Sequence, residues 1–490
     1  NHDEAIRSFS RAAELDADCA MAWWGVSLAA GPQYNHPTLT KERTATAWEA
    51  MQQAIERIDN TTPSERALIL ALRKRNAKEE PDKQGRAKLN EAYAAAMEEI
   101  WNNYPNDPDI GTLYAEAKML LRPWKLYSLD DRTPHKDTPQ IVSALERVIA
   151  MAPIHPGALH LYIHAIEPSQ KPDMGLFAAD RLSDLVPGSG HLLHMPCHIY
   201  LQTGMWDRVV VQSKKAMRSD DRYRRLSPEQ STQYGYMVHN SHMLAFAAMM
   251  SGREREAMAA AREMWADVPD EVLPQVGPKL DRWMCSVYDV QKRFGRWDDL
   301  IAEPPPPEYM LITQATWRAC RAVAYAAKKD FSSAEREYEL FRDARSRLPE
   351  DHAWSSRELA DRVLKVSDHF IPGEIALQKG NWAGAARHLE KAAAIEDTLG
   401  YGEPPQWLQP VRHTLGAVYL SARRFTEAER AHREDLHKWP GNGWSLHGLS
   451  RALTEQGKIE EAAEVKRRFD EVAKGTDFRI TSPCMCLPGS

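Results

Sequence analysis

A tandem repeat of paired helical segments is the feature that most limits what this chain can fold into. The clearest unit runs from Leu415 to Pro440 (LGAVYLSARRFTEAERAHREDLHKWP), and the segment SLHGLSRALTEQGKIEEAAEVKRRF follows it closely. No segment alternates apolar and polar residues in the way that a half-buried strand does. A helical pair of this size cannot bury its apolar face alone, so stacked pairs are expected to share one nearly continuous core.

The residues of these units resemble the tetratricopeptide repeat (TPR), a pair of helices with a period of 34 residues. Leu415, Gly416 and Tyr419 match positions 7, 8 and 11 of that motif. Ala428 and Pro440 match positions 20 and 32. The next unit continues the count without a gap, with Leu446, Leu449, Leu453, Gly457 and Ala462 at positions 4, 7, 11, 15 and 20. The resemblance implies helical pairs that stack into a superhelix with a concave binding face.

The same register extends into the rest of the chain. Pro153, Pro187 and Pro269 each fall at position 32, and Gly204 and Gly252 each fall at position 15, the turn between paired helices. Nearer the N-terminus the matches are Ala5, Phe9 and Ala12 at positions 20, 24 and 27, and Pro105 at position 32. The predicted fold is therefore all-α, a TPR-type right-handed superhelical solenoid of roughly ten helical hairpins, with residues 1–490 as a single domain. Irregular connections are expected near residues 31–82, 218–233 and 303–308, and a C-terminal tail over residues 474–490.

The chain also resembles, over most of its length, a group of bacterial TPR proteins with phrases such as NHDEAIRSF, CAMAWWG, GEPPQW and NGWSLHGL. That resemblance implies the fold and no particular chemistry. The opening residues match the second helix of a pair, and residue 1 is Asn rather than Met. We therefore expect a processed or truncated N-terminus, with any signal peptide out of view.

Composition and motifs disfavour several functional classes. With 63 basic and 69 acidic residues the net charge is −6, which favours neither a nucleic-acid partner nor a polybasic membrane anchor. Residues 231–252, one of the longest uncharged stretches, contain His, Asn and Gln, so we predict no membrane insertion and a soluble protein. Six scattered cysteines form no disulfide framework and leave the compartment open. The chain has no glycine-rich phosphate loop, nucleophile elbow or CxxC zinc knuckle, which argues against nucleotide-driven chemistry.

Histidines are concentrated on one stripe of the predicted helices. Positions 2, 5, 9 and 12 lie along one side of the first helix of each pair, and in TPR proteins this side lines the concave face. Nine of the 18 histidines fall there, where about two are expected by chance. They are His160, His164, His191, His194, His198, His239, His242, His413 and His447, and the first seven come from three consecutive first helices. We expect imidazoles of neighbouring helices to converge, because such helices stand about 8–10 Å apart.

Two HxxxH pairs indicate a metal site. His160 with His164, and His194 with His198, have the spacing by which a helix can chelate one ion, although the Glu of the HExxH motif is absent. Imidazole-rich sites suit Cu, Zn or Fe. The predicted ligands of one or two such ions are His160, His164, His194, His198, His239, His242 and Glu167. An ion there could activate a water for hydrolysis, or support oxygen and electron chemistry if it is Cu or Fe.

Two carboxylates belong to the same predicted stripe. Glu167 is at position 12, and Glu116 is at position 9 of the preceding pair. Each could be a ligand, an orienting partner of a histidine, a general base, or a solvated carboxylate of the groove.

A non-metal function remains open on the sequence alone. The same histidines could grip an extended peptide or a small molecule, which would make the chain a protein- or peptide-binding adaptor. A purely structural scaffold is the third possibility. Near the C-terminus, Cys484 and Cys486 flank Met485 and could form a soft-metal clamp or a redox pair, or be incidental. Glu403 and the nearby Arg412 could pair, with little consequence for function.

Overall fold

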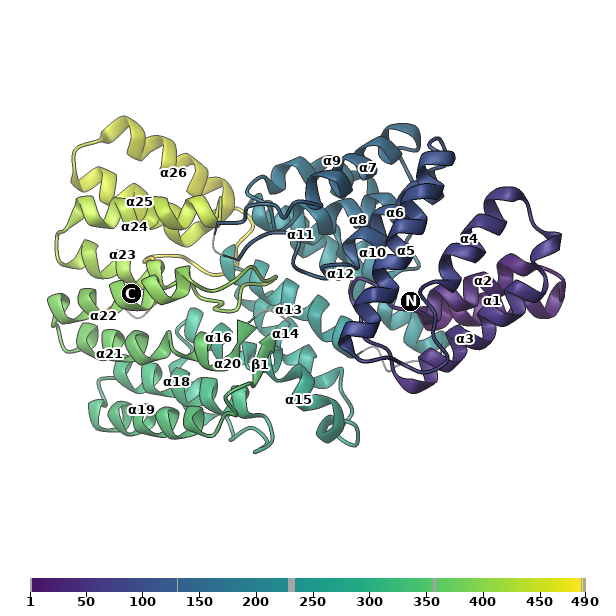
Figure 1. Ribbon diagram of the computed structural model, residues 1–490. Helices are drawn as coiled ribbons and strands as arrows, with labels where there is room; N and C mark the ends of the chain where they lie inside the picture. The colour runs from purple at the N-terminus through teal and green to yellow at the C-terminus, as the bar shows by residue number, and fades with distance from the viewer. Residues whose placement is uncertain (1, 130, 228–233, 356–357, 486, 488–490) are drawn as a thin grey trace. The chain divides into compact units, whose positions relative to one another are not determined.

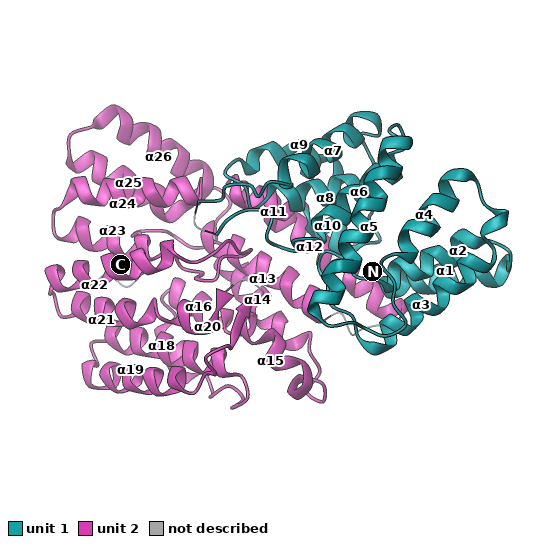
Figure 2. Ribbon diagram, viewed as in Figure 1, with its two compact units in different colours: residues 1–195 teal, residues 196–490 magenta. Residues whose placement is uncertain are grey.

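The computed structural model describes residues 2–129, 131–227, 234–355, 358–485 and 487 (Figure 1). Over these residues most of the chain is helical, which confirms the all-α prediction. It divides into two compact units, residues 1–195 and residues 196–490 (Figure 2). The repeat pattern does not indicate a division at Met195, and the organisation as a single domain stays a prediction.

Unit 1 is a succession of helices in which neighbours along the chain pack side by side, as the TPR-type prediction requires. Its helices are α1 (His2–Leu15), α2 (Ala20–Ala30), α3 (Lys41–Glu56), η1 (Ile58–Asn60), α4 (Pro63–Arg73), α5 (Lys83–Asn103), α6 (Pro108–Met119), α7 (Thr138–Met151), α8 (Pro156–Ile166), η2 (Pro172–Gly175), α9 (Leu176–Leu182) and α10 (Gly190–His194).

Unit 2 continues the same pattern of paired helices. Its elements are α11 (Pro196–Gln202), α12 (Trp206–Leu226), α13 (Tyr234–Met250), α14 (Glu254–Ala266), α15 (Leu273–Met284), α16 (Ser286–Arg293), α17 (Trp297–Ala302), α18 (Leu311–Ala327), α19 (Phe331–Ser346), β1 (Ala353–Ser355), β2 (Glu358–Leu359), α20 (Ala360–Leu364), α21 (Ser367–Gln378), α22 (Trp382–Asp397), α23 (Val411–Ser421), α24 (Phe425–Lys438), α25 (Gly443–Glu455) and α26 (Ile459–Ala473).

The turns between paired helices confirm the register that was counted on the sequence. Gly204, Gly252 and Gly457, all placed at position 15, have φ angles of 73°, 72° and 74°. Only glycine enters this left-handed region without a steric penalty, so the three glycines end one helix and begin its partner. The equivalent residue between α23 and α24 is Arg423, with φ 58°.

Unit 2 brings its first helix pairs against its last. The Trp206 indole donates to the carbonyl of Pro440 at 3.0 Å, and the Trp444 indole donates to the carbonyl of Met249 at 2.8 Å. Phe246 packs on Trp439 with ring centroids 5.5 Å apart. These contacts join α12 and α13 to the hairpin of α24 and α25, which repeat counting along the sequence does not anticipate.

The segment after α26 is packed rather than extended into solvent. Asp477 accepts hydrogen bonds from the backbone N–H groups of Glu254 and Arg255 at 2.7 and 3.3 Å, at the first turn of α14. The Phe478 ring lies 5.0 Å from that of Phe294, and Cys484 is fully buried. The described part of the predicted tail, residues 474–485 and 487, is therefore part of the fold of unit 2.

The structure differs in part from the irregular connections and the absence of strands that the sequence predicts. Residues 31–82 were expected to form an irregular connection but contain α3 and α4, since breaks in the repeat register do not require breaks in helix. Residues 303–308 do connect α17 to α18, whereas α12 continues to Leu226 and residues 228–233 lie outside the described residues. The expectation of no strands was wrong in one place, because β1 and β2 form a small antiparallel sheet too short to show alternation.

Candidate metal centre

Helix α8 presents His160 and His164 on one face. The helix begins at Pro156, whose missing N–H suits the first helical position. His155 caps it, because its Nδ1 accepts a hydrogen bond from the backbone N–H of Ala158 at 3.1 Å. The packing positions 4, 7, 8 and 11 are all buried and hold Leu159, Tyr162, Ile163 and Ile166. His160 and His164 are four residues apart, so their side chains lie on the same face of α8.

The third histidine of the cluster, His191, comes from the short helix α10. The Ser189 hydroxyl caps this helix by accepting a hydrogen bond from the backbone N–H of Leu192 at 3.3 Å. His191 follows the cap by two residues, so its side chain is placed by the first turn of the helix.

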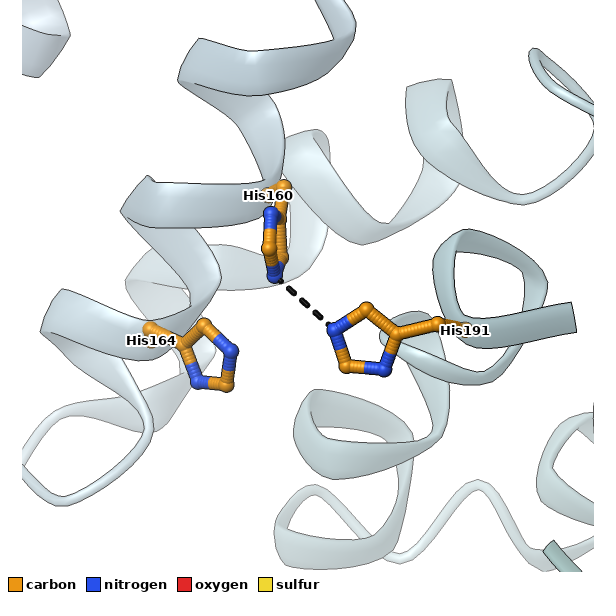
Figure 3. A group of neighbouring side chains, drawn as sticks. All are labelled: His160, His164 and His191. Carbon is orange, nitrogen blue, oxygen red and sulfur yellow. Dashed lines mark hydrogen bonds between the residues drawn. The ribbon is translucent and has the colours of Figure 1, made fainter. Parts of the chain in front are cut away.

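The imidazoles of His160, His164 and His191 point toward one another (Figure 3). One nitrogen from each ring lies within 4.8 Å of the other two. The Nε2 atoms of His160 and His191 are 3.2 Å apart. At this distance one ring donates a hydrogen bond to the other (Figure 3), and two nitrogens bound to one tetrahedral ion at about 2.0–2.1 Å would stand about as far apart, at about 3.3 Å.

Glu167 holds His164 from outside the cluster. The Oε1 atom of Glu167 lies 2.9 Å from Nδ1 of His164, and the two side chains are 0% and 1% exposed. With Nδ1 engaged by a carboxylate, Nε2 is the nitrogen through which His164 would coordinate an ion. A carboxylate behind a ligating histidine fixes the tautomer and raises the basicity of the ring. Of the roles left open for Glu167, the geometry within unit 1 favours that of orienting partner.

Two aromatic rings enclose His164 on another side. The Tyr34 ring is 5.2 Å from the imidazole, and the Trp124 ring meets it edge-on at 5.1 Å. Trp124 has a φ angle of 60°, a region that bulky residues rarely adopt and that the packing of its ring on Tyr34, at 5.0 Å, must stabilise. His164 is therefore buried, whereas His160 and His191 are half-buried.

Two further residues of the predicted stripe in unit 1 are His194 and Glu116. His194, at the end of α10, is buried with its ring 6.4 Å from that of His191. Glu116, on α6, is half-buried, and burial raises its pKa while the nearby Arg75 guanidinium lowers it. Glu116 is not among the residues gathered around His160.

His198 begins the histidine set of unit 2 and pairs with Glu403. The Nδ1 atom of His198 contacts Oε2 of Glu403, and the two side chains are 6% and 4% exposed. The structure does not pair Glu403 with Arg412, which instead binds Asp397 and Glu434. Closeness in sequence misled here, because the helix that begins at Val411 turns Arg412 away from the loop that carries Glu403.

His239 and His242 lie one turn apart on α13, against Trp283. The His239 ring stacks on the indole at 5.6 Å, and the His242 ring is 6.4 Å from it. Burial, and secondarily the charge of Arg282, lowers the pKa of His242 to about 3, which keeps this imidazole neutral. The His239 ring also lies 6.0 Å from that of His198.

Sequence reasoning missed two features of these sites. His191 was counted on the stripe but was not among the predicted ligands. His194 and His198 were expected on one continuous helix, but α10 ends at His194 and α11 begins at Pro196, so the helix is interrupted at Met195. Pro196 lacks an N–H and its ring clashes with the carbonyl four residues earlier, and this signal was visible in the sequence. Whether all the predicted ligands share one site stays a prediction.

The C-terminal cysteines do not form a thiolate clamp in the described residues. Cys484 is disulfide-bonded, and its Sγ accepts a hydrogen bond from the Thr414 hydroxyl at 3.3 Å. A disulfide sulfur lacks the negative charge with which a thiolate binds soft metals. Cys486 lies outside the described residues.

Comparison with known proteins adds little to this geometry. No family model matches the sequence, and no curated protein matches it. Among solved structures, the human IFIT1 dimer with m7Gppp-AAAA is similar with a TM-score of 0.34 and 15% identity, over 88% of this chain and 87% of that one. Naa15/Naa10 bound to HypK-THB is similar with a TM-score of 0.29 and 13% identity, over 84% of this chain and 64% of that one. At such TM-scores, the function has to be inferred from the residues of this chain. Of the helices in the described ranges, none has the length and apolar character that crossing a bilayer requires.

Proposed function

We propose that unit 1 binds one transition-metal ion through His160, His164 and His191. The observation that carries the proposal is the convergence of three imidazole nitrogens within 4.8 Å of one another. Three clustered imidazoles without an ion repel one another whenever they take up protons, whereas an ion coordinated by neutral rings removes that penalty. The carboxylate of Glu167 supplies the orienting contact that metal-bound histidines usually have.

Three imidazole ligands favour zinc or copper, with iron as a further candidate. Tetrahedral zinc sites with three protein ligands keep the fourth position for water or substrate and lower the pKa of a bound water to about 7. A redox-inert ion would therefore support hydrolysis, and copper or iron would support oxygen or electron chemistry. His160 and His191 are half-buried, which leaves an approach for a small molecule. The absence of a nucleic-acid partner stays a prediction.

The test is the ion content of the purified full-length chain, measured by elemental analysis after chelator treatment and reloading with zinc or copper. His160→Ala and His191→Ala are each expected to lose one equivalent of ion relative to the parent protein. His135→Ala is the matched control in unit 1, because His135 joins its neighbours through backbone hydrogen bonds to Leu126 and Thr138.

The opposite result would separate the metal proposal from its alternative. A parent protein that takes up no ion, with unchanged thermal stability in His191→Ala, would overturn the metal proposal. The histidine-lined surface would then be better explained as a peptide-binding one, and the chain as an adaptor.

A further inference from the structure

A cleft of about 660 Å³ lies between α14 and α17, within unit 2. Small-molecule sites in proteins have volumes of about 300–1,000 Å³, so the cleft has the size of a ligand site. One wall is the face of α14 on which Glu254, Met258 and Arg262 follow one another at intervals of about one helical turn. The other wall is formed by α17 and the residues that flank it, from Arg296 to Pro304. The lining includes none of the residues proposed to bind an ion in unit 1, so a ligand here does not depend on that ion.

Two ion pairs bridge the walls of the cleft. Arg296, which precedes α17, binds Glu254 of α14, and Arg262 of α14 binds Glu303, which follows α17. Because Glu254 and Arg262 are eight residues apart, the two ion pairs are separated by about 12 Å along α14. The side chains of Glu254 and Glu303 are 14% and 11% exposed, whereas those of Arg296 and Arg262 are 52% and 50% exposed. The guanidinium groups therefore lie nearer the solvent, and the carboxylates lie deeper.

Gln291, near the end of α16, adds a buried oxygen to the lining. Its side chain is 1% exposed, and its amide nitrogen donates a hydrogen bond to Oε1 of Glu303 at 2.6 Å. An ionised carboxylate can only accept, so this contact identifies the amide nitrogen and leaves the amide oxygen on the other side. That oxygen is buried and accepts no hydrogen bond from the described residues. A buried acceptor of this kind costs stability unless a donor from outside the chain reaches it.

The cleft carries an excess of negative charge. Asp299, which is exposed on α17, is the third carboxylate of the lining. The third guanidinium of the lining belongs to Arg255, and it binds Asp477, which lies outside the lining, at 2.8 Å. Ion pairs therefore balance all three arginines, and the charge of Asp299 is left over. Met258 lies between the two bridging ion pairs on α14 and gives the middle of the cleft an apolar surface.

We propose that this cleft binds an aliphatic polyamine, a chain of methylene groups with a cationic nitrogen toward each end. One nitrogen would donate to the free oxygen of Gln291 and to Glu303, and another would bind Glu254, about 12 Å away along α14. The methylene groups between them would cover Met258. The charge of Asp299 attracts such a ligand to the open side of the cleft. An anionic ligand would instead meet the deeper carboxylates and would leave the Gln291 oxygen without a donor.

The test is equilibrium dialysis of labelled spermidine against the full-length chain at about 0.15 M salt, which screens attraction to the general surface charge. Glu303→Gln is expected to weaken binding by about 10-fold or more, because it removes the charge from a buried contact. Asp299→Asn changes an exposed carboxylate and is expected to weaken binding by about 2- to 5-fold. Asp298→Asn is the matched control, because Asp298 is the adjacent exposed carboxylate of α17 and pairs with Lys328 instead.

Three results would overturn the proposal. The first is a parent protein that does not bind spermidine, and the second is equal affinity in the parent, Glu303→Gln and Asp299→Asn. The third is saturable binding of succinate that Arg262→Gln abolishes, because the cleft would then recognise an anion through its exposed arginines. If circular dichroism shows that Glu303→Gln does not fold, Asp299→Asn decides, because substitutions at exposed positions seldom affect folding.

Discussion

Replacing Glu167 tests whether the buried carboxylate tunes the proposed metal site of unit 1. Its oxygen lies 2.9 Å from Nδ1 of His164, and both side chains are buried, so the contact acts in a region of low effective dielectric. A hydrogen bond to a charged group is worth about 1.5–3 kcal/mol under such conditions. The loss of a carboxylate behind a ligating histidine typically lowers metal affinity by about 10- to 100-fold, or about 1.4–2.7 kcal/mol. The two estimates of the free energy agree, so Glu167→Ala is expected to raise the Kd for zinc by about 10- to 100-fold.

The assay is competition between the protein and a chromophoric chelator for zinc. Glu167→Gln is expected to fall between the parent and Glu167→Ala, because an amide oxygen can accept the hydrogen bond without the negative charge. Glu146→Ala is the matched control: Glu146 lies on α7, and its carboxylate accepts a hydrogen bond from the Tyr162 hydroxyl of α8 at 3.1 Å, outside the cluster of histidines. A Kd within about twofold of the parent, together with a lower melting temperature, would refute the reasoning and leave Glu167 a structural residue.

Three further predictions concern the fold. Burial raises the pKa of Glu396 from 4.5 to about 7, so the folded state keeps a proton that the unfolded state releases between those values. The free energy of unfolding should therefore fall, by up to about 3 kcal/mol, as pH rises through that window. Chemical denaturation at pH 5 and pH 8 should show this fall in the parent protein and a smaller one in Glu396→Gln. An equal fall in both proteins would contradict the prediction. Leu415→Ala should destabilise unit 2 by about 2–5 kcal/mol in urea denaturation without altering ion content, because the side chain is only 6% exposed. Asp477→Ala removes the carboxylate that caps α14, so it should lower the free energy of unfolding by about 1 kcal/mol and speed amide hydrogen exchange in residues 476–485. Unchanged exchange would show that the other contacts of this segment hold it in place.

The elements that sequence reasoning placed correctly are those governed by local rules. Apolar spacing and the glycines at position 15 fixed where helices turn, and Gly204 and Gly252 indeed have positive φ angles. The same count put His160 and His164 on one face of α8, because residues four apart lie one above the other on a helix.

The features that were missed depend on contacts between residues distant in the sequence. Nothing in the repeat pattern places Glu403 beside His198, since loops carry no period that could be counted. The enclosure of His164 by Trp124 likewise depends on a loop residue with φ 60°. His191 was on the predicted stripe, but its partnership with His160 depends on how a five-residue helix begins at Gly190.

The most direct measurement of the central claim is X-ray absorption at the zinc edge of the full-length protein loaded with one equivalent of zinc. The expected spectrum shows three imidazole nitrogens at about 2.0–2.1 Å, with the fourth position filled by an oxygen ligand such as water. A first shell composed of oxygen alone, or with fewer than two imidazoles, would contradict coordination by His160, His164 and His191.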